Sequence, residues 1–143
     1  MSDLELAKTQ LYQKQLTLVI VKNGIILYQT ANSRISGFLS AIEKLGSSLA
    51  GASVADRVVG KAVALLCVFI NIKNVYASLL SQSAYFVFIQ NNISCSYTEI
   101  VENILNKNKT DLCPFEKIAL NLSQPNDAYQ SFRLLNEKLN LGK

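Results

Sequence analysis

The chain has 143 residues, the size of one typical domain, and this length can bury a core without disulfides or metals. Half of the residues are hydrophobic, 17% are charged and the net charge is +4, which excludes a disordered or fibrous chain. The sequence contains no histidine. Histidine-based acid–base catalysis, Ser–His and Cys–His pairs and every histidine-ligated metal site are therefore excluded.

Hydrophobic spacing and turn residues divide the chain into alternating helices and strands. In chain order we expect a helix over 3–14, strands over 16–21 and 25–30, helices over 35–45 and 53–70, a strand over 74–79, a helix over 81–90, a strand over 93–98, and helices over 99–106, 113–122 and 126–141. This order indicates a single layered α/β domain over 1–143. We expect the last helix, 126–141, to pack on the first, 1–14.

Three local signals support this division. Asn23–Gly24 is a strong hairpin turn, so the first two strands are antiparallel. Ser53–Asp56 has the pattern of a capping box and predicts the start of the long helix that runs to about Ile70. From Ala62 onward that helix is apolar on every side, so we expect it to be the buried centre of the domain.

The N-terminus has neither a basic start nor an apolar segment, so no secretory signal is expected. Cys67, Cys95 and Cys113 are odd in number and widely spaced, which favours free thiols and a cytoplasmic location. The apolar stretch 62–72 is too short to span a membrane. The chain has no run of Lys and Arg, so no nucleic-acid partner is expected.

The segment Asp56–Ala64, with the sequence DRVVGKAVA, resembles the signature of the domain of unknown function 1893, a small prokaryotic family. The later segments 75–81, 106–107 and 111–116 resemble further parts of that family's pattern. The resemblance covers about 16–129. This sequence departs from the pattern with Lys107 in place of the usual Arg and with Val63 in place of an Ala.

The resemblance implies a cytidine-deaminase-like fold, a three-layer α/β/α sandwich with a mixed sheet and an N-terminal antiparallel hairpin. In zinc deaminases the metal ligands lie at the starts of two helices, in H-x-E and P-C-x-x-C motifs. The corresponding segments, around Asp56 and at 80–84, contain neither His nor Cys. We therefore expect no zinc, no other cofactor and no zinc-dependent deamination.

Cys113 is the strongest candidate for a reactive group. Pro114 suits the first position of a helix, which places Cys113 at the N-cap, where the helix dipole favours a thiolate. Such a thiol could act as a nucleophile. In the alternative interpretation, sulfur only caps the helix, and Glu116 completes a pair that resembles a capping box.

A second candidate site lies at 56–61. Gly60 allows a ligand or another backbone to approach closely, and Lys61 enters the apolar segment. On a helix, Arg57 and Lys61 would share one face and could bind a phosphate or carboxylate, while Asp56 and Lys61 are candidate catalytic groups. The structural alternative is that Asp56 caps the helix and Lys61 pairs with a distant carboxylate.

Ser81 follows a strand at a helix start, where α/β sheets often bind ligands; alternatively it is an ordinary N-cap. Asn106 and Lys107 lie in a polar loop that could close over a ligand, and Glu116 is a further ligand-binding candidate. Two hypotheses remain open. In the first, a zinc-free pocket binds a small nucleotide-like or anionic molecule, with Asp56, Lys61 and Cys113 as catalytic candidates. In the second, the chain is a non-catalytic interaction module, with a homodimer as one form.

Overall fold

The computed structural model describes residues 1–32, 35–106 and 108–141, which form one five-stranded sheet covered by helices. The strands are β1 (Leu18–Lys22), β2 (Ile25–Thr30), β3 (Ser53–Val59), β4 (Asn74–Ser81) and β5 (Ser94–Val101). The helices are α1 (Asp3–Gln13), α2 (Ile35–Leu45), α3 (Lys61–Phe69), α4 (Gln82–Gln90), α5 (Pro114–Ala119) and α6 (Pro125–Leu141), with a short 3-10 turn at Gly46–Leu49.

The strand order is β2-β1-β3-β4-β5. Strand β1 is antiparallel to both β2 and β3, whereas β3, β4 and β5 run parallel to one another. Asn23 and Gly24 form the hairpin turn with φ of 53° and 76°, as the Asn–Gly signal predicts. The mixed sheet with its N-terminal hairpin is confirmed.

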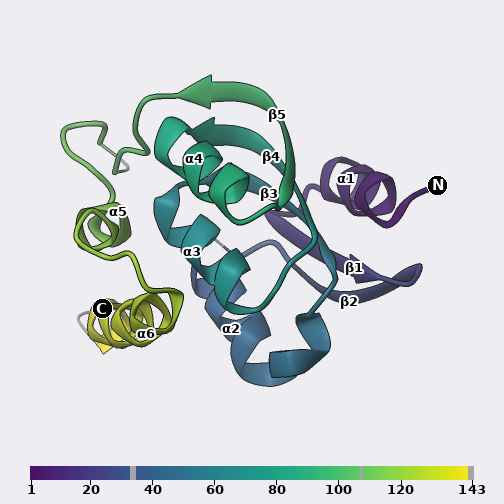
Figure 1. The fold of residues 1–143 in the computed structure, drawn as a ribbon, viewed down its shortest axis with the longest axis horizontal. Helices are drawn as coiled ribbons and strands as arrows, with labels where there is room; N and C mark the ends of the chain where they lie inside the picture. Colours follow the sequence, from purple (N-terminus) through teal and green to yellow (C-terminus); the bar gives the residue numbers. More distant parts are fainter. Residues whose placement is uncertain (33–34, 107, 142–143) are drawn as a thin grey trace.

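Helices lie on both faces of the sheet, so the three-layer α/β/α sandwich is also confirmed (Figure 1). On one face α1 buries Ala7 and Leu11 against β1, β3 and Tyr76 of β4. On the other face α2, α3, α4, α5 and α6 enclose the larger core. Strand β3 serves both cores, because Val54 faces the larger core and its neighbour Ala55 faces α1.

The central helix is confirmed, but its predicted start is wrong. Helix α3 buries every residue from Ala62 to Cys67, whereas the segment 53–59 is strand β3. The Ser53 hydroxyl accepts a hydrogen bond from the Asn74 side chain at 3.2 Å instead of capping a helix. A strand buried on both faces is nearly continuously hydrophobic, so its periodicity does not separate it from a buried helix.

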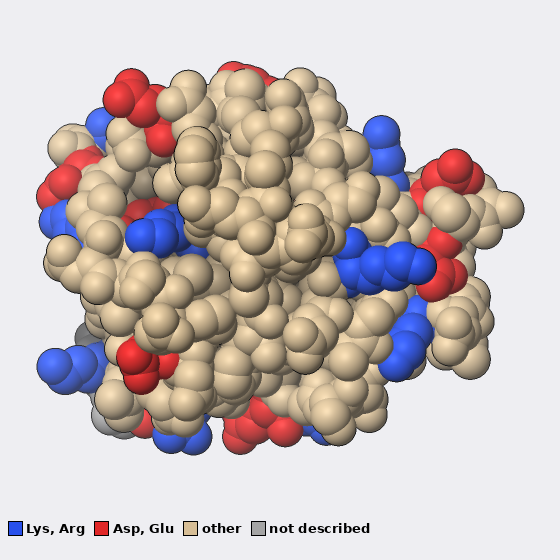
Figure 2. Space-filling model, in the orientation of Figure 1, with Lys and Arg blue, Asp and Glu red and all other residues tan. Residues whose placement is uncertain are grey.

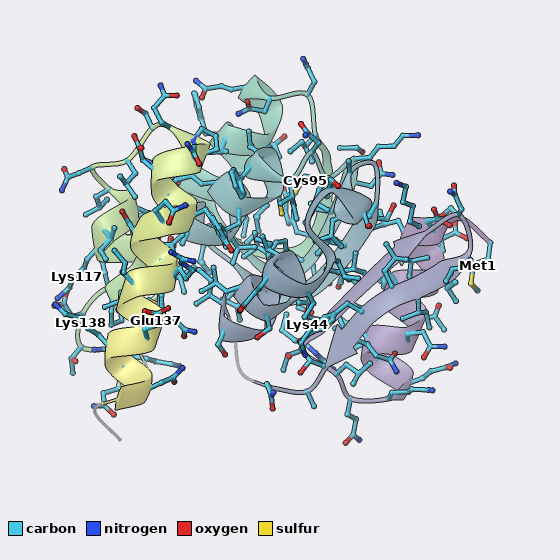
Figure 3. All side chains as sticks on the ribbon, turned by 90° about the horizontal axis from the view of Figure 1, so that it is seen from below. Met1, Lys44, Cys95, Lys117, Glu137 and Lys138 are labelled. Carbon is cyan, nitrogen blue, oxygen red and sulfur yellow. The ribbon has the colours of Figure 1, made fainter. Side chains whose placement is uncertain are left out.

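Two further expectations about the C-terminal half are wrong. No helix forms over 99–106, because β5 continues to Val101 and a bridge between Leu105 and Leu112 follows. Helix α6 packs against α3, α5 and α2 rather than against α1, which lies on the opposite face of the sheet. Figure 3 shows Met1 and α6 at opposite ends of the molecule. Among the described residues no helix is long and apolar enough to cross a membrane.

Candidate functional site

Two adjacent strand-to-helix junctions form the centre of the candidate site. Strands β3 and β4 are parallel neighbours, and Val59 of β3 pairs with Leu80 of β4. The next residues, Gly60 and Ser81, are the N-caps of α3 and α4. The carboxyl ends of parallel strands are where α/β proteins most often bind ligands.

The start of α3 is capped by a carboxylate from a distant part of the chain. Glu116 of α5 accepts the backbone N–H of Lys61 at 2.9 Å through Oε1 and that of Ala62 at 2.8 Å through Oε2. The side chain is buried, and burial raises the pKa of Glu116 although both N–H groups and Lys61 favour the charged form. The positive end of α3 thus holds an anion that belongs to the protein itself.

This contact explains the glycine at position 60. A Cβ atom there would collide with all three atoms of the Glu116 carboxylate. The backbone of Gly60, with φ of −102°, is accessible to any residue, so the glycine is needed for close approach and not for its conformation. The sequence predicts close approach to Gly60 by a ligand or another backbone, whereas the group found there is the side-chain carboxylate of Glu116.

A cavity of about 440 Å³ opens beside this cap. The first residues of α2, α3 and α5 and the C-terminal part of α6 surround it. Its lining consists of Ile35, Ser36, Val58, Gly60, Ala62, Val63, Ile104, Asn106, Asn108, Cys113, Pro114, Phe115, Glu116, Asn136, Leu139 and Asn140. Among these described lining residues, Glu116 is the only charged one.

The polar part of the lining is rich in amides. Asn106 is already engaged, because its side chain donates to the Thr110 hydroxyl at 3.2 Å and accepts the Thr110 N–H at 3.0 Å. Asn136 and Asn140 lie one turn apart on α6, and neither amide has a hydrogen-bond partner among the described residues. The cavity therefore offers two amides that are free to donate and accept hydrogen bonds.

Cys113 lines this cavity, at the predicted N-cap of α5 with Pro114 at the first helical position. The residue is 9% exposed, and its sulfur makes no capping hydrogen bond. The alternative interpretation, in which Cys113 and Glu116 cap α5 together, is wrong, because the sulfur makes no capping hydrogen bond and the Glu116 carboxylate binds the start of α3. Among the predicted site residues, Gly60, Asn106, Cys113 and Glu116 come together here, and Lys107 lies outside the described residues.

Asp56 is not among the residues that line the cavity. It lies within β3, so the structural alternative in which Asp56 caps a helix is wrong. Its side chain is buried, and burial raises its pKa to about 7, although Oδ1 accepts the Val58 N–H at 3.3 Å. Its charge also helps to raise the pKa of Cys67, a thiol in the core on α3.

Arg57 and Lys61 do not share a face, which corrects the prediction based on a continuous helix. Arg57 points to the α1 side of the sheet, where it donates to the backbone oxygens of Leu16 at 2.9 Å and Leu11 at 3.1 Å. Its guanidinium also stacks 4.7 Å from the centre of the Tyr12 ring. Lys61 lines a separate groove along α4.

Ser81 is an ordinary N-cap, which was the structural alternative for this residue. Its hydroxyl accepts the Ala84 N–H at 3.1 Å, and the side chain is fully buried and lines neither the cavity nor the α4 groove. Within the described parts of the chain, no three His, Cys, Asp or Glu side chains are grouped to hold a metal.

Sequence analysis missed Asn136 and Asn140. Their spacing of four on a predicted helix is the signal that places them on one face. Only the position of α6 against α3 and α5 shows that this face meets the start of α3.

The mixed five-stranded sheet with helices on both faces defines a three-layer α/β/α domain. The chain belongs to the family described as Domain of unknown function (DUF1893), whose model matches residues 6–139. The family resemblance and the three-layer α/β/α sandwich with a mixed sheet, both expected from the sequence, are confirmed. No curated protein matches this chain.

One solved structure supports the family assignment, and two others are more distantly similar. A DUF1893 family protein from Thermotoga maritima is similar with a TM-score of 0.82 and 25% identity, over 96% of this chain and 91% of that one. The dCMP deaminase of cyanophage S-TIM5 is similar with a TM-score of 0.48 and 14% identity, over 66% and 92%. A diaminohydroxyphosphoribosylaminopyrimidine deaminase/reductase from Thermotoga maritima has a TM-score of 0.46 and 19% identity, over 70% and 32%.

Proposed function

We propose that the cavity beside Glu116 binds a small, uncharged, nucleoside-like molecule. The observation that carries this proposal is the pair of free amides, Asn136 and Asn140, over a cavity of about 440 Å³ with largely apolar walls. This volume is in the range of ligand pockets, which combine apolar walls with a few polar groups that orient the ligand. A planar group with hydrogen-bond donors and acceptors on its edge fits such a surface.

Charge distinguishes between the two ligand types that the sequence predicts. An anion would compete with Glu116 for the N–H groups at the start of α3. No Lys or Arg lies among the described lining residues to balance a second negative charge. The geometry therefore favours a nucleoside over its phosphate, because Glu116 repels an anion in this partly desolvated site.

A thermal-shift screen with the common ribonucleosides, deoxyribonucleosides and their 5′-monophosphates tests this proposal. We expect at least one nucleoside to raise the melting temperature. At a hundredfold excess over its dissociation constant, such a ligand increases the free energy of unfolding by about 2.7 kcal/mol. The matching monophosphate is expected to bind at least tenfold more weakly. The absence of any response would overturn the proposal and favour the non-catalytic alternative.

Substitutions on α6 test whether the thermal shift arises from binding in this cavity. Asn136→Leu removes one free amide and is expected to weaken nucleoside binding at least tenfold, with little change in stability, because the amide has no partner among the residues that the structure describes. Glu137→Gln is the matched control, because the adjacent Glu137 is exposed and is not part of the lining (Figure 3). Equal binding by Asn136→Leu and Glu137→Gln would contradict the assignment of the site.

We further propose that Cys113 is an accessible thiol of this site. Its position at the start of α5 and in the cavity lining supports thiol chemistry on a bound ligand. Iodoacetamide labelling followed against pH, with Cys67 and Cys95 as internal controls, is expected to modify Cys113 first. A bound nucleoside should slow this labelling. Labelling no faster than at the fully buried Cys67 would overturn this proposal and leave Cys113 without a reactive role.

A further inference from the structure

Four side-chain hydroxyls, those of Tyr12, Tyr76, Ser78 and Thr98, form a hydrogen-bonded network on the α1 face of the sheet. The hydroxyl of Tyr12 on α1 lies 2.7 Å from that of Ser78 and 2.6 Å from that of Tyr76, both on β4. The Tyr76 hydroxyl also forms a hydrogen bond with the hydroxyl of Thr98 on β5. Tyr76 is buried, whereas Tyr12 is 41% exposed. A molecule in solution can therefore reach this hydroxyl network at Tyr12.

The hydroxyl network holds one proton more than its internal hydrogen bonds need. Four neutral hydroxyls carry four protons, while the three contacts between neighbouring oxygens use three of them. After the loss of one proton, Ser78 and Tyr76 can both donate to a Tyr12 phenolate. Thr98 then donates to Tyr76, so every contact keeps one donor. Because hydrogen bonds to a charged acceptor are stronger than those between neutral groups, the geometry favours a phenolate within the network.

Burial decides which of the two phenols loses a proton more readily. Burial raises the pKa of Tyr76, which is 3% exposed. At Tyr12 burial acts in the same direction but is outweighed, so the pKa of Tyr12 lies below its ordinary value. The groups that lower it are the hydroxyls of Ser78 and Tyr76 and the positive charge of Arg57. The phenolate is therefore expected on the ring that solvent reaches.

Two cations lie over the rings of the same tyrosine pair. The Lys8 ammonium is 4.5 Å from the centre of the Tyr76 ring, and the Arg57 guanidinium is 4.7 Å from the centre of the Tyr12 ring. Within the described parts of the chain neither cation forms an ion pair, because the acidic side chains at the start of α1 bind the β1–β2 turn and Ser2. Figure 2 shows positive charge on the side of the molecule that α1 occupies in Figure 1, beside a broad middle area without charged residues. These cations favour a negative charge on the tyrosine pair.

We propose that Tyr12 is a nucleophilic phenol that accepts an acyl group from an activated acyl donor, such as an ester of an acidic alcohol. In this reaction the Tyr12 oxygen forms a bond to the acyl carbon, and the bond from that carbon to the leaving group breaks. The leaving group takes the electron pair and receives the proton that Tyr12 gives up. The charge of Arg57 beside the phenol offsets the negative charge that develops on the acyl oxygen. The site is independent of the cavity, which lies on the other face of the sheet.

Acetylation of the full-length chain by N-acetylimidazole, located by peptide mass spectrometry, tests this proposal. Tyr97 is the internal reference, because it is also 41% exposed and its hydroxyl has no hydrogen-bond partner among the described residues. At neutral pH we expect Tyr12 to react at least fivefold faster than Tyr97. A smaller ratio would overturn the proposal, since exposure alone would then account for the reactivity of Tyr12.

Ser78→Ala separates a nucleophilic role of the network from a purely structural one. The change removes one donor to the Tyr12 phenolate, so the rate at Tyr12 should fall at least threefold. If the hydrogen bond were only structural, its loss would free the phenol and raise this rate. Ser96→Ala is the matched control, because Ser96 pairs with Tyr76 in the sheet but forms no hydrogen bond with the four hydroxyls. A Tyr12 rate in Ser78→Ala that is not below that in Ser96→Ala would overturn the proposal. Circular dichroism confirms that each variant is folded.

Discussion

The β3–α3 and β4–α4 units are neighbours with the same design but different chemistry. In the sheet Asp56 pairs with Ala77, and each of these residues lies four positions before the N-cap of the following helix. The β4–α4 unit uses an apolar Ala77 and caps its own helix with Ser81. The β3–α3 unit buries the carboxyl of Asp56 and receives its cap from Glu116 of α5.

The difference between the two units shows that β3–α3 lacks the locally capped, uncharged arrangement that β4–α4 has. A local Ser cap needs no other element, whereas the Glu116 cap requires α5 and the loop before it to be in place. Burial of Asp56 raises its pKa, so holding it ionised costs free energy. Buried carboxyls with raised pKa values at and near the cavity are typical of functional sites.

The largest effect is expected from Gly60→Ala. The new methyl group would collide with the Glu116 carboxylate and force it from the start of α3. Overpacking together with the loss of two hydrogen bonds to a charged group should lower the free energy of unfolding by about 4 kcal/mol. Urea unfolding at pH 7 measures this change.

A double-mutant cycle separates collision from backbone effects. In Glu116→Ala the carboxylate is absent, so adding Gly60→Ala should cost much less than it does in the wild type. Full additivity of the two changes would show that Glu116 is not the group that requires a glycine at position 60.

The next effect concerns Asp56 and pH. Burial raises its pKa to about 7, so at intermediate pH the folded chain keeps a proton that the unfolded chain releases near pH 4. The free energy of unfolding should therefore fall as pH rises from about 4 to about 7. Asp56→Asn removes this loss and should stabilise the protein by roughly 3 kcal/mol at pH 8 but little at pH 4.

Asp111→Asn is the control for this pH dependence. The exposed carboxylate of Asp111 forms an ion pair with Lys117. The hydrogen bond from Lys117 holds the pKa of Asp111 below its usual range. Removing it should slightly destabilise the protein above pH 4, the opposite sign to Asp56→Asn. Urea unfolding of both variants at pH 5 and pH 8 makes the comparison. If the difference in free energy of unfolding between Asp56→Asn and the wild type is the same at both pH values, the pKa of Asp56 is not raised in the folded chain.

The two units also show how far the sequence predicts this structure. The β4–α4 unit is predicted almost in full, because Ser81 caps the helix that directly follows it. The start of α3 is not predicted, because its cap comes from Glu116, which is 54 residues after Ala62. Ser53–Asp56 then resembles a helix start, although Val54 and Ala55 are buried on opposite faces of the sheet.

The residues that line the cavity also divide into those that local sequence predicts and those that it does not. Cys113 at the start of α5 is predicted from Pro114 and the local pattern. The contribution of Asn136 and Asn140 depends on the packing of α6 against α3, and no local pattern encodes that contact. Local sequence therefore predicts a helix start whose signal lies in the same segment, as at Ser81 and Pro114, but not one that depends on a distant side chain.

Glu116→Gln tests the remote cap without creating a cavity. The amide can accept one of the two N–H groups of Lys61 and Ala62, but its own NH₂ would face the other. One buried donor loses its partner, so the free energy of unfolding should fall by about 2 kcal/mol. A loss below about 0.5 kcal/mol would mean that water replaces the carboxylate easily.

The smallest effect is expected from Ser81→Ala in the β4–α4 unit. This change removes only the hydroxyl that accepts the Ala84 N–H, and an N-cap of this kind contributes about 1 kcal/mol. Urea unfolding should therefore rank Ser81→Ala as milder than Glu116→Gln, and nucleoside binding should be unchanged because Ser81 does not line the cavity. If Ser81→Ala abolished the thermal shift with full retention of stability, the binding site would have to include the α4 junction. The two units would then differ only in how their helices are capped, and both helix starts would contribute to ligand recognition.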